Sequence, residues 1–201
     1  MDDIQNVKII LVGSINVGKT SLVTKYATGK NPCISKSTKN ASYITKKKFV
    51  DGINFEIKLW DTAGQERYKS LTQLFMKDSK IALLVYSIDD EKSFNDLNEW
   101  LKLIKNSNDE NIILGVIANK SDLASENTIK DERGKEYAKK IGADWKSTSA
   151  LVDNRGIDEI IDLLFSKYYN SNFKMDQSNS ISISIDEIKS KKRKKKKCCS
   201  G

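Results

Sequence analysis

The chain has 201 residues, of which 38% are hydrophobic, and this length suits one compact domain with short appendages. The formal charge is +8, but residues 189–197 carry eight Lys and Arg, so the remainder is neutral and lacks the basic body of a nucleic-acid-binding protein. The absence of histidine excludes histidine bases and histidine metal ligands, and the three cysteines form neither a disulfide framework nor a structural zinc pattern.

The sequence indicates neither a membrane-spanning segment nor a secretory signal. No run of about eighteen apolar residues occurs, and the first residues, MDDIQNVKIILVG, carry acids where a secretory signal carries positive charge. We therefore expect a protein that does not span a membrane and works in the cytosol.

Apolar runs and helical patterns alternate along the first 169 residues. Continuous apolar or alternating stretches predict strands, and apolar side chains repeated every three or four residues predict helices. In chain order we expect strands over 7–13, 55–61 and 81–88, a helix over 91–106, a strand over 111–119, a helix over 131–142, a short strand before 148 and a helix over 157–169. This alternation predicts an α/β fold in which helices cover both faces of a mostly parallel sheet.

Two stretches within this region are expected to have structural roles. The apolar stripe of Phe94, Trp100 and Ile104 is predicted to face the core. The basic residues 46–48 are expected to lie at a solvated strand edge, where charge opposes aggregation.

The periodic pattern stops after Tyr169. Residues 170–190 are polar and rich in serine, which is typical of a flexible linker. Residues 191–201 contain seven consecutive basic residues followed by Cys198 and Cys199. We therefore divide the chain into a folded domain over 1–169, a linker over 170–190 and a tail over 191–201.

The sequence GSINVGKT, residues 13–20, follows the first predicted strand and opens a helical stretch, which is the context that a phosphate-binding P-loop requires. Its glycines let successive backbone N–H groups point into one concavity, and the helix N-terminus adds partial positive charge. Lys19 is placed to reach the outer phosphates, and the Thr20 hydroxyl to bind Mg²⁺. A glycine turn before an ordinary helix is the alternative. The expected phosphate-binding residues are Gly13, Ser14, Ile15, Asn16, Val17, Gly18, Lys19, Thr20 and Ser21.

Three further motifs follow later strands. In WDTAGQE, Asp61 ends a strand where a carboxylate can hold a metal ion beside the P-loop hydroxyl. In NKSD, Asp122 offers a carboxylate that accepts two hydrogen bonds from the N1 and N2 edge of guanine, which adenine cannot supply. The TSA sequence at 148–150 offers a backbone N–H to the base oxygen. Each motif is weak by itself, but in this order at strand ends they indicate a guanine-nucleotide site.

Taken together, these motifs resemble those of small GTPases of the Ras superfamily, and most closely the Rab family. The resemblance covers about residues 6–169 and rests on GSINVGKT, WDTAGQERY, LVYSI and NKSD, with two cysteines near the end. It implies the P-loop NTPase (small G-protein) fold, with a six-stranded, mostly parallel sheet flanked by five helices. It also implies a monomeric switch that uses Mg²⁺ and is active with GTP and idle with GDP.

The resemblance assigns roles to individual residues. Thr38 would complete the Mg²⁺ shell with Thr20 and Asp61, and Gln65 would orient the attacking water, with Lys19 and Thr38 also taking part in hydrolysis. Loss of the γ-phosphate would release Thr38 and the Gly64 amide together, and partners would read that change. The guanine would be surrounded by Asn119, Lys120, Asp122, Ser149, Ala150 and Leu151.

The implied function is recruitment of effectors to membranes in vesicle-mediated transport. Further implied partners are an exchange factor, an activating protein, and prenyl-escort and extraction proteins, but no nucleic acid. Prenyl groups on Cys198 and Cys199, together with the basic run, would hold the protein on the cytoplasmic face of an intracellular membrane, from which it cycles to the cytosol. A nuclear address is the alternative reading of the basic run.

Departures from the family pattern lead to two further hypotheses. Ile15 stands where relatives carry glycine or a small residue, and its branched side chain is expected to crowd the γ-phosphate and slow hydrolysis, unless it points away. Asn31 replaces an aromatic residue that relatives stack on the base, which predicts faster spontaneous nucleotide loss.

Ile15 keeps a second function open, that of a GTP-bound docking module with little or no GTPase activity. A third candidate, a P-loop phosphotransferase or a nucleic-acid factor, is opposed by Asp122 and by the neutral body.

Overall fold

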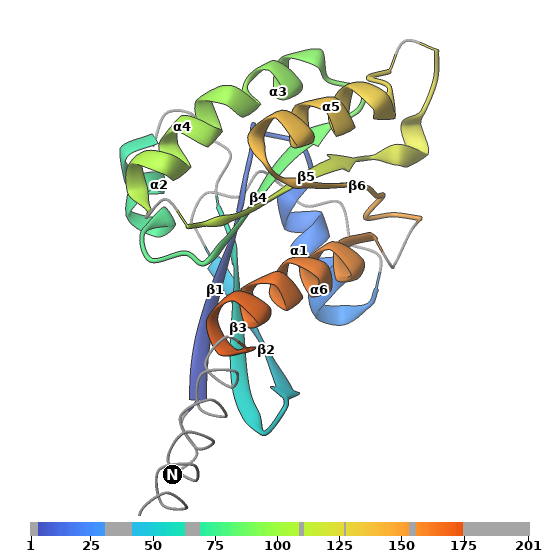
Figure 1. The fold of residues 1–201 in the computed structure, drawn as a ribbon. Coiled ribbons are helices and arrows are strands. Elements are labelled where there is room, and N and C mark those ends of the chain that lie inside the picture. Colours follow the sequence, from blue (N-terminus) through green and yellow to red (C-terminus); the bar gives the residue numbers. More distant parts are fainter. Residues whose placement is uncertain are drawn as a thin grey trace, which may run out of the picture. The chain divides into compact units, whose positions relative to one another are not determined.

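The computed structural model describes residues 4–30, 42–62, 69–108, 111–126, 128–152 and 156–174 (Figure 1). The chain separates into two units, Met1–Leu164 and Phe165–Gly201, which are described in turn.

A six-stranded sheet organises the first unit. Its strands, in chain order, are β1 (Ile4–Val12), β2 (Ser42–Val50), β3 (Ile53–Asp61), β4 (Ile81–Ser87), β5 (Ile113–Asn119) and β6 (Asp144–Ser147). They lie side by side in the order β2-β3-β1-β4-β5-β6. Every neighbouring pair is parallel except β2 and β3, which are antiparallel. The prediction of a six-stranded, mostly parallel sheet is confirmed.

The helices among the described residues are α1 (Lys19–Thr28), α2 (Lys69–Met76), α3 (Glu91–Asn95), α4 (Leu97–Ser107), α5 (Asp131–Ile141) and α6 (Gly156–Tyr169), with a 3-10 turn at Ser121–Leu123. The five predicted helices are found, with the one expected over 91–106 divided at Asp96 into α3 and α4. Asp96 keeps helical angles, φ −66° and ψ −14°, so the interruption is a single residue.

Hydrophobic side chains pack against both faces of the sheet. Along β5, Leu114 and Val116 join the cluster formed with α3, α4 and α5, while Gly115 faces the other way. A Cβ on Gly115 would lie 2.7 Å from Leu164 and 2.8 Å from Leu83, so α6 packs closely on β5 at this glycine. Figure 1 shows α3, α4 and α5 on one side of the sheet and α1 and the start of α6 on the other. This arrangement matches the predicted α/β layers.

The apolar stripe that was predicted to face the core does so. Phe94, Trp100 and Ile104 are buried in the cluster under α3 and α4. Removal of a side chain of this kind from a packed core costs about 2–5 kcal/mol of stability, so these residues contribute to the stability of the fold.

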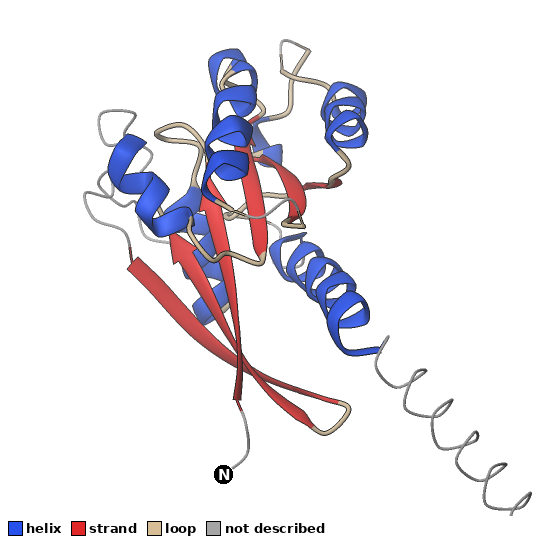
Figure 2. Cartoon of the chain, turned by 60° about the vertical axis from the view of Figure 1, so that its left-hand side comes forward, coloured by secondary structure: helices blue, strands red, loops and turns tan. Residues whose placement is uncertain are grey.

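The hairpin of β2 and β3 was not foreseen as a whole (Figure 2). Its turn is Asp51 and Gly52, with φ of 48° and 84°, between the paired residues Val50 and Ile53. Positive φ at both central positions is the geometry of a type I′ turn, whose twist suits an antiparallel pair.

The basic residues at 46–48 lie on β2 at the edge of the sheet, as expected. They are partly solvated, as expected, but two of them also make contacts that the sequence did not indicate. The Lys48 ammonium pairs with Asp162 at 2.6 Å, while that of Lys46 lies 3.7 Å from Asp158 and 3.5 Å from the centre of the Tyr26 ring. These contacts attach the edge strand to α6 and α1.

The second unit is described over residues 165–174. Its backbone stays helical past Tyr169, as a π-helical stretch at Asn170–Lys174, so the first residues of the predicted linker are helical. The Tyr169 and Phe173 rings stack at 5.6 Å, and Asn172 Nδ2 donates to the Tyr168 carbonyl at 2.8 Å. Among the described ranges, no helix has the length and apolar character needed to cross a membrane.

The parallel strands bring their carboxyl ends to one edge of the sheet. β1 is central, with β3 on one side and β4 on the other, so the order of the strands reverses at β1. In open α/β sheets a ligand crevice forms at such a reversal, outside the carboxyl ends of the strands. The segments that follow β1, β3, β5 and β6 contain the motifs singled out in the sequence.

Candidate nucleotide-binding site

The loop at residues 13–18 joins β1 to α1, as the P-loop pattern predicted. Gly13 has a φ of 150°, and a Cβ there would collide with the carbonyl oxygen of Val85. Gly18 has a φ of 91°, and its Cβ would collide with the side-chain amide of Asn119. Both positions therefore require glycine, for backbone conformation and for lack of space.

Lys19 begins α1 and is almost completely buried, with 5% of its surface exposed. Its ammonium donates to the carbonyls of Gly13 at 2.7 Å and Ser14 at 2.9 Å, across the inside of the loop. Burial lowers the pKa of Lys19 to about 8, although the nearby charge of Asp61 acts in the opposite direction. A desolvated cation held this way is poorly compensated by the protein, which suits an anionic ligand.

Thr20 and Asp61 form the second feature of the site. The Thr20 hydroxyl donates to Asp61 Oδ2 at 2.7 Å, joining the start of α1 to the end of β3. Asp61 is 2% exposed, and its other oxygen, Oδ1, has no hydrogen-bond partner among the described residues. Burial raises the pKa of Asp61, opposed by the Thr20 hydrogen bond and the charge of Lys19.

The Thr20 and Asp61 side chains have the chemistry that Mg²⁺ requires of its ligands. A hard divalent cation prefers oxygen ligands, and here a hydroxyl and a buried carboxylate with one unsatisfied oxygen already lie together. A bound cation would favour the ionised form of the carboxylate that burial disfavours. Thr20 and Asp61 are therefore suitable ligands.

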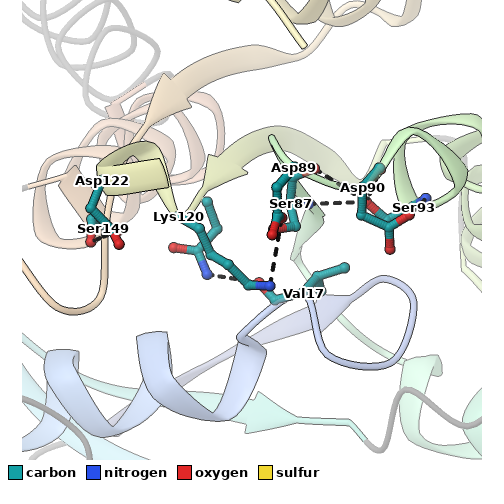
Figure 3. Close-up of polar contacts among 9 residues, drawn as sticks. Val17, Ser87, Asp89, Asp90, Ser93, Lys120, Asp122 and Ser149 are labelled. Carbon is teal, nitrogen blue, oxygen red and sulfur yellow. Dashed lines mark hydrogen bonds and ion pairs between the residues drawn. The ribbon is translucent and has the colours of Figure 1, made fainter. Parts of the chain in front are cut away.

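The predicted base-recognition residues meet at the ends of β5 and β6 (Figure 3). The Ser149 hydroxyl donates to Asp122 Oδ1 and accepts from the backbone N–H groups of Leu151 at 3.1 Å and Val152 at 3.2 Å. The Ser121 N–H donates to the Thr148 carbonyl at 3.1 Å, which joins the two loops. The Asp122 carboxylate is thus held in one orientation.

Asn119 connects the base-recognition loop with the phosphate loop. Its Nδ2 donates to the Val17 carbonyl at 2.7 Å, while its buried Oδ1 has no partner among the described residues. The two loops therefore share a direct hydrogen bond, and a buried acceptor next to it remains available to a ligand.

The positions of the remaining predicted site residues vary, and some of these residues lie outside the described ranges. Ser21 lies in the first turn of α1 and Asn16 has a left-handed φ of 64°. Ala150 is buried, whereas Ile15 and Leu151 are exposed. Thr38, Gly64, Gln65, Cys198 and Cys199 lie outside the described residues, as do Asn31 and the tail.

Sequence reasoning missed two acidic residues beside the site. The Ser14 hydroxyl donates to Asp96 Oδ2 at 2.8 Å, so the phosphate loop is tied to the break between α3 and α4. Asp89, just after β4, lies 3.6 Å from the Lys120 ammonium (Figure 3). Both pairs join residues far apart in the sequence, and no local pattern signals them.

The strand order and the loop after β1 define the class of the protein, an α/β protein with the small G-protein fold. The model of the Ras family matches residues 8–170. Over 153 residues the sequence is 39% identical to Ras-related protein Rab-21 of Homo sapiens, covering 76% of this chain and 68% of that protein. The chain belongs to the Ras family and, within it, to the Rab-type small GTPases.

Other relatives have similar sequence identities to this chain. Ras-related protein Rab-21 of Geodia cydonium is 37% identical over 153 residues, which cover 76% of this chain and 66% of that protein. Ras-related protein RABA1b of Arabidopsis thaliana is 35% identical over 161 residues, with coverage of 80% and 74%. The matched region thus spans about two thirds of the length of the Rab-21 relatives.

Proposed function

We propose that the protein is a molecular switch that binds GTP and GDP with Mg²⁺, hydrolyses GTP, and recruits effectors to membranes in vesicle-mediated transport. The observation that carries this proposal is the convergence at one sheet edge of a buried lysine, a hydroxyl–carboxylate pair and an oriented Asp122. Each supplies one part of what a guanine nucleotide and its cation require.

The phosphates are assigned to the loop after β1. Lys19 presents its charge from the inner side of the loop, and the start of α1 adds the partial positive charge of a helix N-terminus. Thr20 and Asp61 hold Mg²⁺, which neutralises charge on the phosphate oxygens when it is bound. Guanine is selected by Asp122, because only a base with two adjacent N–H donors satisfies both carboxylate oxygens.

GTP hydrolysis is attributed to the positioning of water and phosphate and to electrostatic stabilisation of the transition state. The chain has no histidine, so the water is oriented by Gln65 and the phosphate is held by Lys19, with Thr38 completing the metal shell. Thr38, Gly64 and Gln65 remain predictions from the family pattern.

The test of this function is nucleotide competition. The purified chain is loaded with fluorescent GDP and Mg²⁺, and unlabelled nucleotides are added. We expect GDP and GTP to displace the probe at stoichiometric concentrations, whereas ATP in large excess leaves it bound, because adenine offers no pair of donors to Asp122. Displacement of the probe by ATP at the concentrations at which GDP and GTP displace it would overturn the guanine assignment.

An aromatic row supports effector binding beside this site. The ring centres of Tyr43 and Trp60 are 4.7 Å apart, and those of Trp60 and Phe75 are 5.8 Å apart, so the row runs from β2 across β3 to α2. Tyr43 is 51% exposed. This partly exposed row lies on elements that in the sequence border the segments containing Thr38 and Gln65, and we propose it as a surface for a partner that reads the bound nucleotide.

Ile15 leads to a prediction about the rate of hydrolysis. Its side chain is 37% exposed and so is not held in the core, which leaves it available to lie over the phosphates. We expect Ile15→Gly to raise single-turnover GTP hydrolysis by about tenfold, because a crowded site cannot align water and phosphate. Ile4→Gly, at the opposite end of β1 and 50% exposed, is the control and should leave the rate unchanged.

The same measurement decides between hydrolysis and docking. The second candidate function, a GTP-bound docking module, is favoured by the position of Ile15 in the phosphate loop. Negligible hydrolysis by the native chain with recovery in Ile15→Gly would support the docking module. Equal rates in the two proteins would show that Ile15 has no influence on turnover.

Membrane attachment is assigned to the tail. Prenyl groups on Cys198 and Cys199 supply a hydrophobic anchor, and the basic run adds attraction to anionic lipids. We expect the double substitution of Cys198 and Cys199 by serine to move the full-length protein from the membrane to the soluble fraction of cells. Cys33→Ser, the remaining cysteine, is the matched control. Full membrane retention of the double variant would contradict lipid anchoring through these residues.

A further inference from the structure

Asp89 lies just after β4, where the backbone is fastened to the end of β5. Ser87 and Asn119 are paired across the two strands, and the Ile88 N–H donates to the Asn119 carbonyl at 3.1 Å. The Asp90 N–H donates back to the Ser87 carbonyl at 3.1 Å. The carboxylate of Asp89 therefore projects from a backbone that is fixed directly beside the base-recognition loop.

The start of α3 strengthens this support. Asp90 caps the helix, accepting from the Ser93 N–H at 3.2 Å, and the Ser93 hydroxyl donates to the Asp90 carbonyl at 2.7 Å. The Ser93 hydroxyl oxygen also accepts from the Ser87 N–H at 3.0 Å. Figure 3 shows this set on the side of Asp89 away from Asp122.

Lys120 reaches Asp89 from the other side. Its backbone is left-handed, with φ 62° and ψ 39°, and its side chain points from the end of β5 toward Asp89 (Figure 3). The ammonium lies 3.6 Å from Asp89 Oδ1, which also accepts from the Ser87 hydroxyl. Burial raises the pKa of Asp89, but the Ser87 hydrogen bond and the Lys120 charge lower it by more, so the carboxylate is ionised at neutral pH.

We propose that Asp89 is a positioning residue for nucleotide binding, which holds the ammonium of Lys120 and so keeps this lysine ordered beside Asn119 at the base-binding edge. The inference rests on the proposed guanine-nucleotide site and deepens it. Ser87 orients the carboxylate, and Asp89 acts only through Lys120.

The physical basis is the flexibility of lysine. A free lysine side chain samples many rotamers and loses that freedom when it packs against a ligand. Because Asp89 confines Lys120 before the nucleotide arrives, less freedom is lost on binding and the bound state lasts longer. The pair is partly exposed, so its effect is in the range of surface ion pairs, about threefold to fivefold in a dissociation rate.

The experiment measures release of fluorescent GDP from the full-length protein with Mg²⁺ and excess unlabelled GDP. We expect Asp89→Asn to release GDP about three to five times faster at low salt. Asparagine keeps the shape and can still accept from Ser87, so the fold is retained. Asp89→Glu restores the charge and should bring the rate back toward that of the native chain. Glu91→Gln, which removes an acid of α3 that pairs with Arg133 at 2.6 Å, is the matched control.

Two further readouts separate positioning from a general structural effect. The difference between the native protein and Asp89→Asn should shrink in 1 M salt, because screening weakens a Coulombic pair, whereas a structural defect would persist. In a Lys120→Met background, Asp89→Asn should have no additional effect, because the two substitutions remove the same interaction.

The outcomes distinguish this inference from the function on which it rests. Failure of the native chain to bind GDP would overturn both. GDP binding with equal release rates for the native protein and Asp89→Asn would overturn the role of Asp89 alone. An effect of Asp89→Asn that is undiminished in the Lys120→Met background would do the same.

Discussion

Replacing Lys19 by methionine is expected to abolish GDP and GTP binding while making the nucleotide-free protein more stable. The ammonium is held by the carbonyls of Gly13 and Ser14 inside the proposed phosphate loop. From this position it would donate charge-assisted hydrogen bonds to phosphate oxygens. Such bonds contribute about 1.5–3 kcal/mol each, so losing two of them weakens nucleotide affinity by about 10³-fold or more. Titration with fluorescent GDP measures this loss.

The gain in stability follows from the lowered pKa of Lys19. The pKa is 10.5 for an unperturbed lysine and about 8 in the folded protein, so between these values the unfolded chain binds more protons than the folded one. Stability of the nucleotide-free protein therefore rises as pH increases from about 8 to 10.5. At pH 7 charging Lys19 costs about 3 kcal/mol more in the folded protein than in the unfolded chain, and methionine, which carries no charge, avoids this cost.

Urea unfolding of the nucleotide-free native protein and Lys19→Met, at neutral pH and near pH 10, checks both parts of this prediction. The native protein should gain stability relative to Lys19→Met as the pH is raised. Lys102→Met, on the exposed side of α4, should change neither nucleotide binding nor the pH dependence. A Lys19→Met protein that is less stable than the native one at pH 7 would contradict the assigned cost of burial.

The second large effect is expected from Asp122→Asn, which should exchange guanine for xanthine. The carboxylate accepts from both N–H groups of guanine, whereas the amide offers one acceptor and one donor. Xanthine matches the amide, because its ring carries an N–H next to a carbonyl. GDP affinity should fall by about 10²-fold or more and xanthosine diphosphate should become the preferred ligand, because the amino group of guanine would face the asparagine NH₂ and neither donor would have an acceptor.

The structure indicates that this substitution leaves the loop intact. The Ser149 hydroxyl donates to Asp122 Oδ1, and an asparagine oxygen accepts the same bond. Competition between the two diphosphates for the native and variant proteins measures the exchange, with Glu126→Gln as a control for loss of one acidic charge from the same loop. Unchanged preference for GDP in Asp122→Asn would contradict the assignment of Asp122 to the base.

Most of the sheet could be predicted because its central strands are buried on both faces. The stretches that became β1, β4 and β5 are nearly continuous in apolar residues, which gives an unambiguous pattern. β2 was harder to predict because it is an edge strand with three consecutive lysines. Its alternating exposure means that it contains no continuous apolar run. Its strongest local signal was the pair Asp51 and Gly52, typical of a hairpin turn.

The site was predictable to the extent that its motifs are local. The loop from Gly13 to Lys19 is a contiguous pattern whose glycines have direct steric reasons. Asp96 and Asp89 were missed because their roles depend on contacts across the fold. Asp96 lies 82 residues from Ser14, and only the strand order brings them together.

The hydrogen bond from Asn119 to the Val17 carbonyl makes the two ends of a bound nucleotide mechanically dependent on each other. The residues proposed to bind the phosphates and the base lie on different loops, and this bond joins the two loops directly. Displacement of one loop would therefore disturb the group that the other loop contributes to this bond. If the proposed nucleotide site is correct, a partner that acts on one loop would weaken the hold on both ends of the nucleotide.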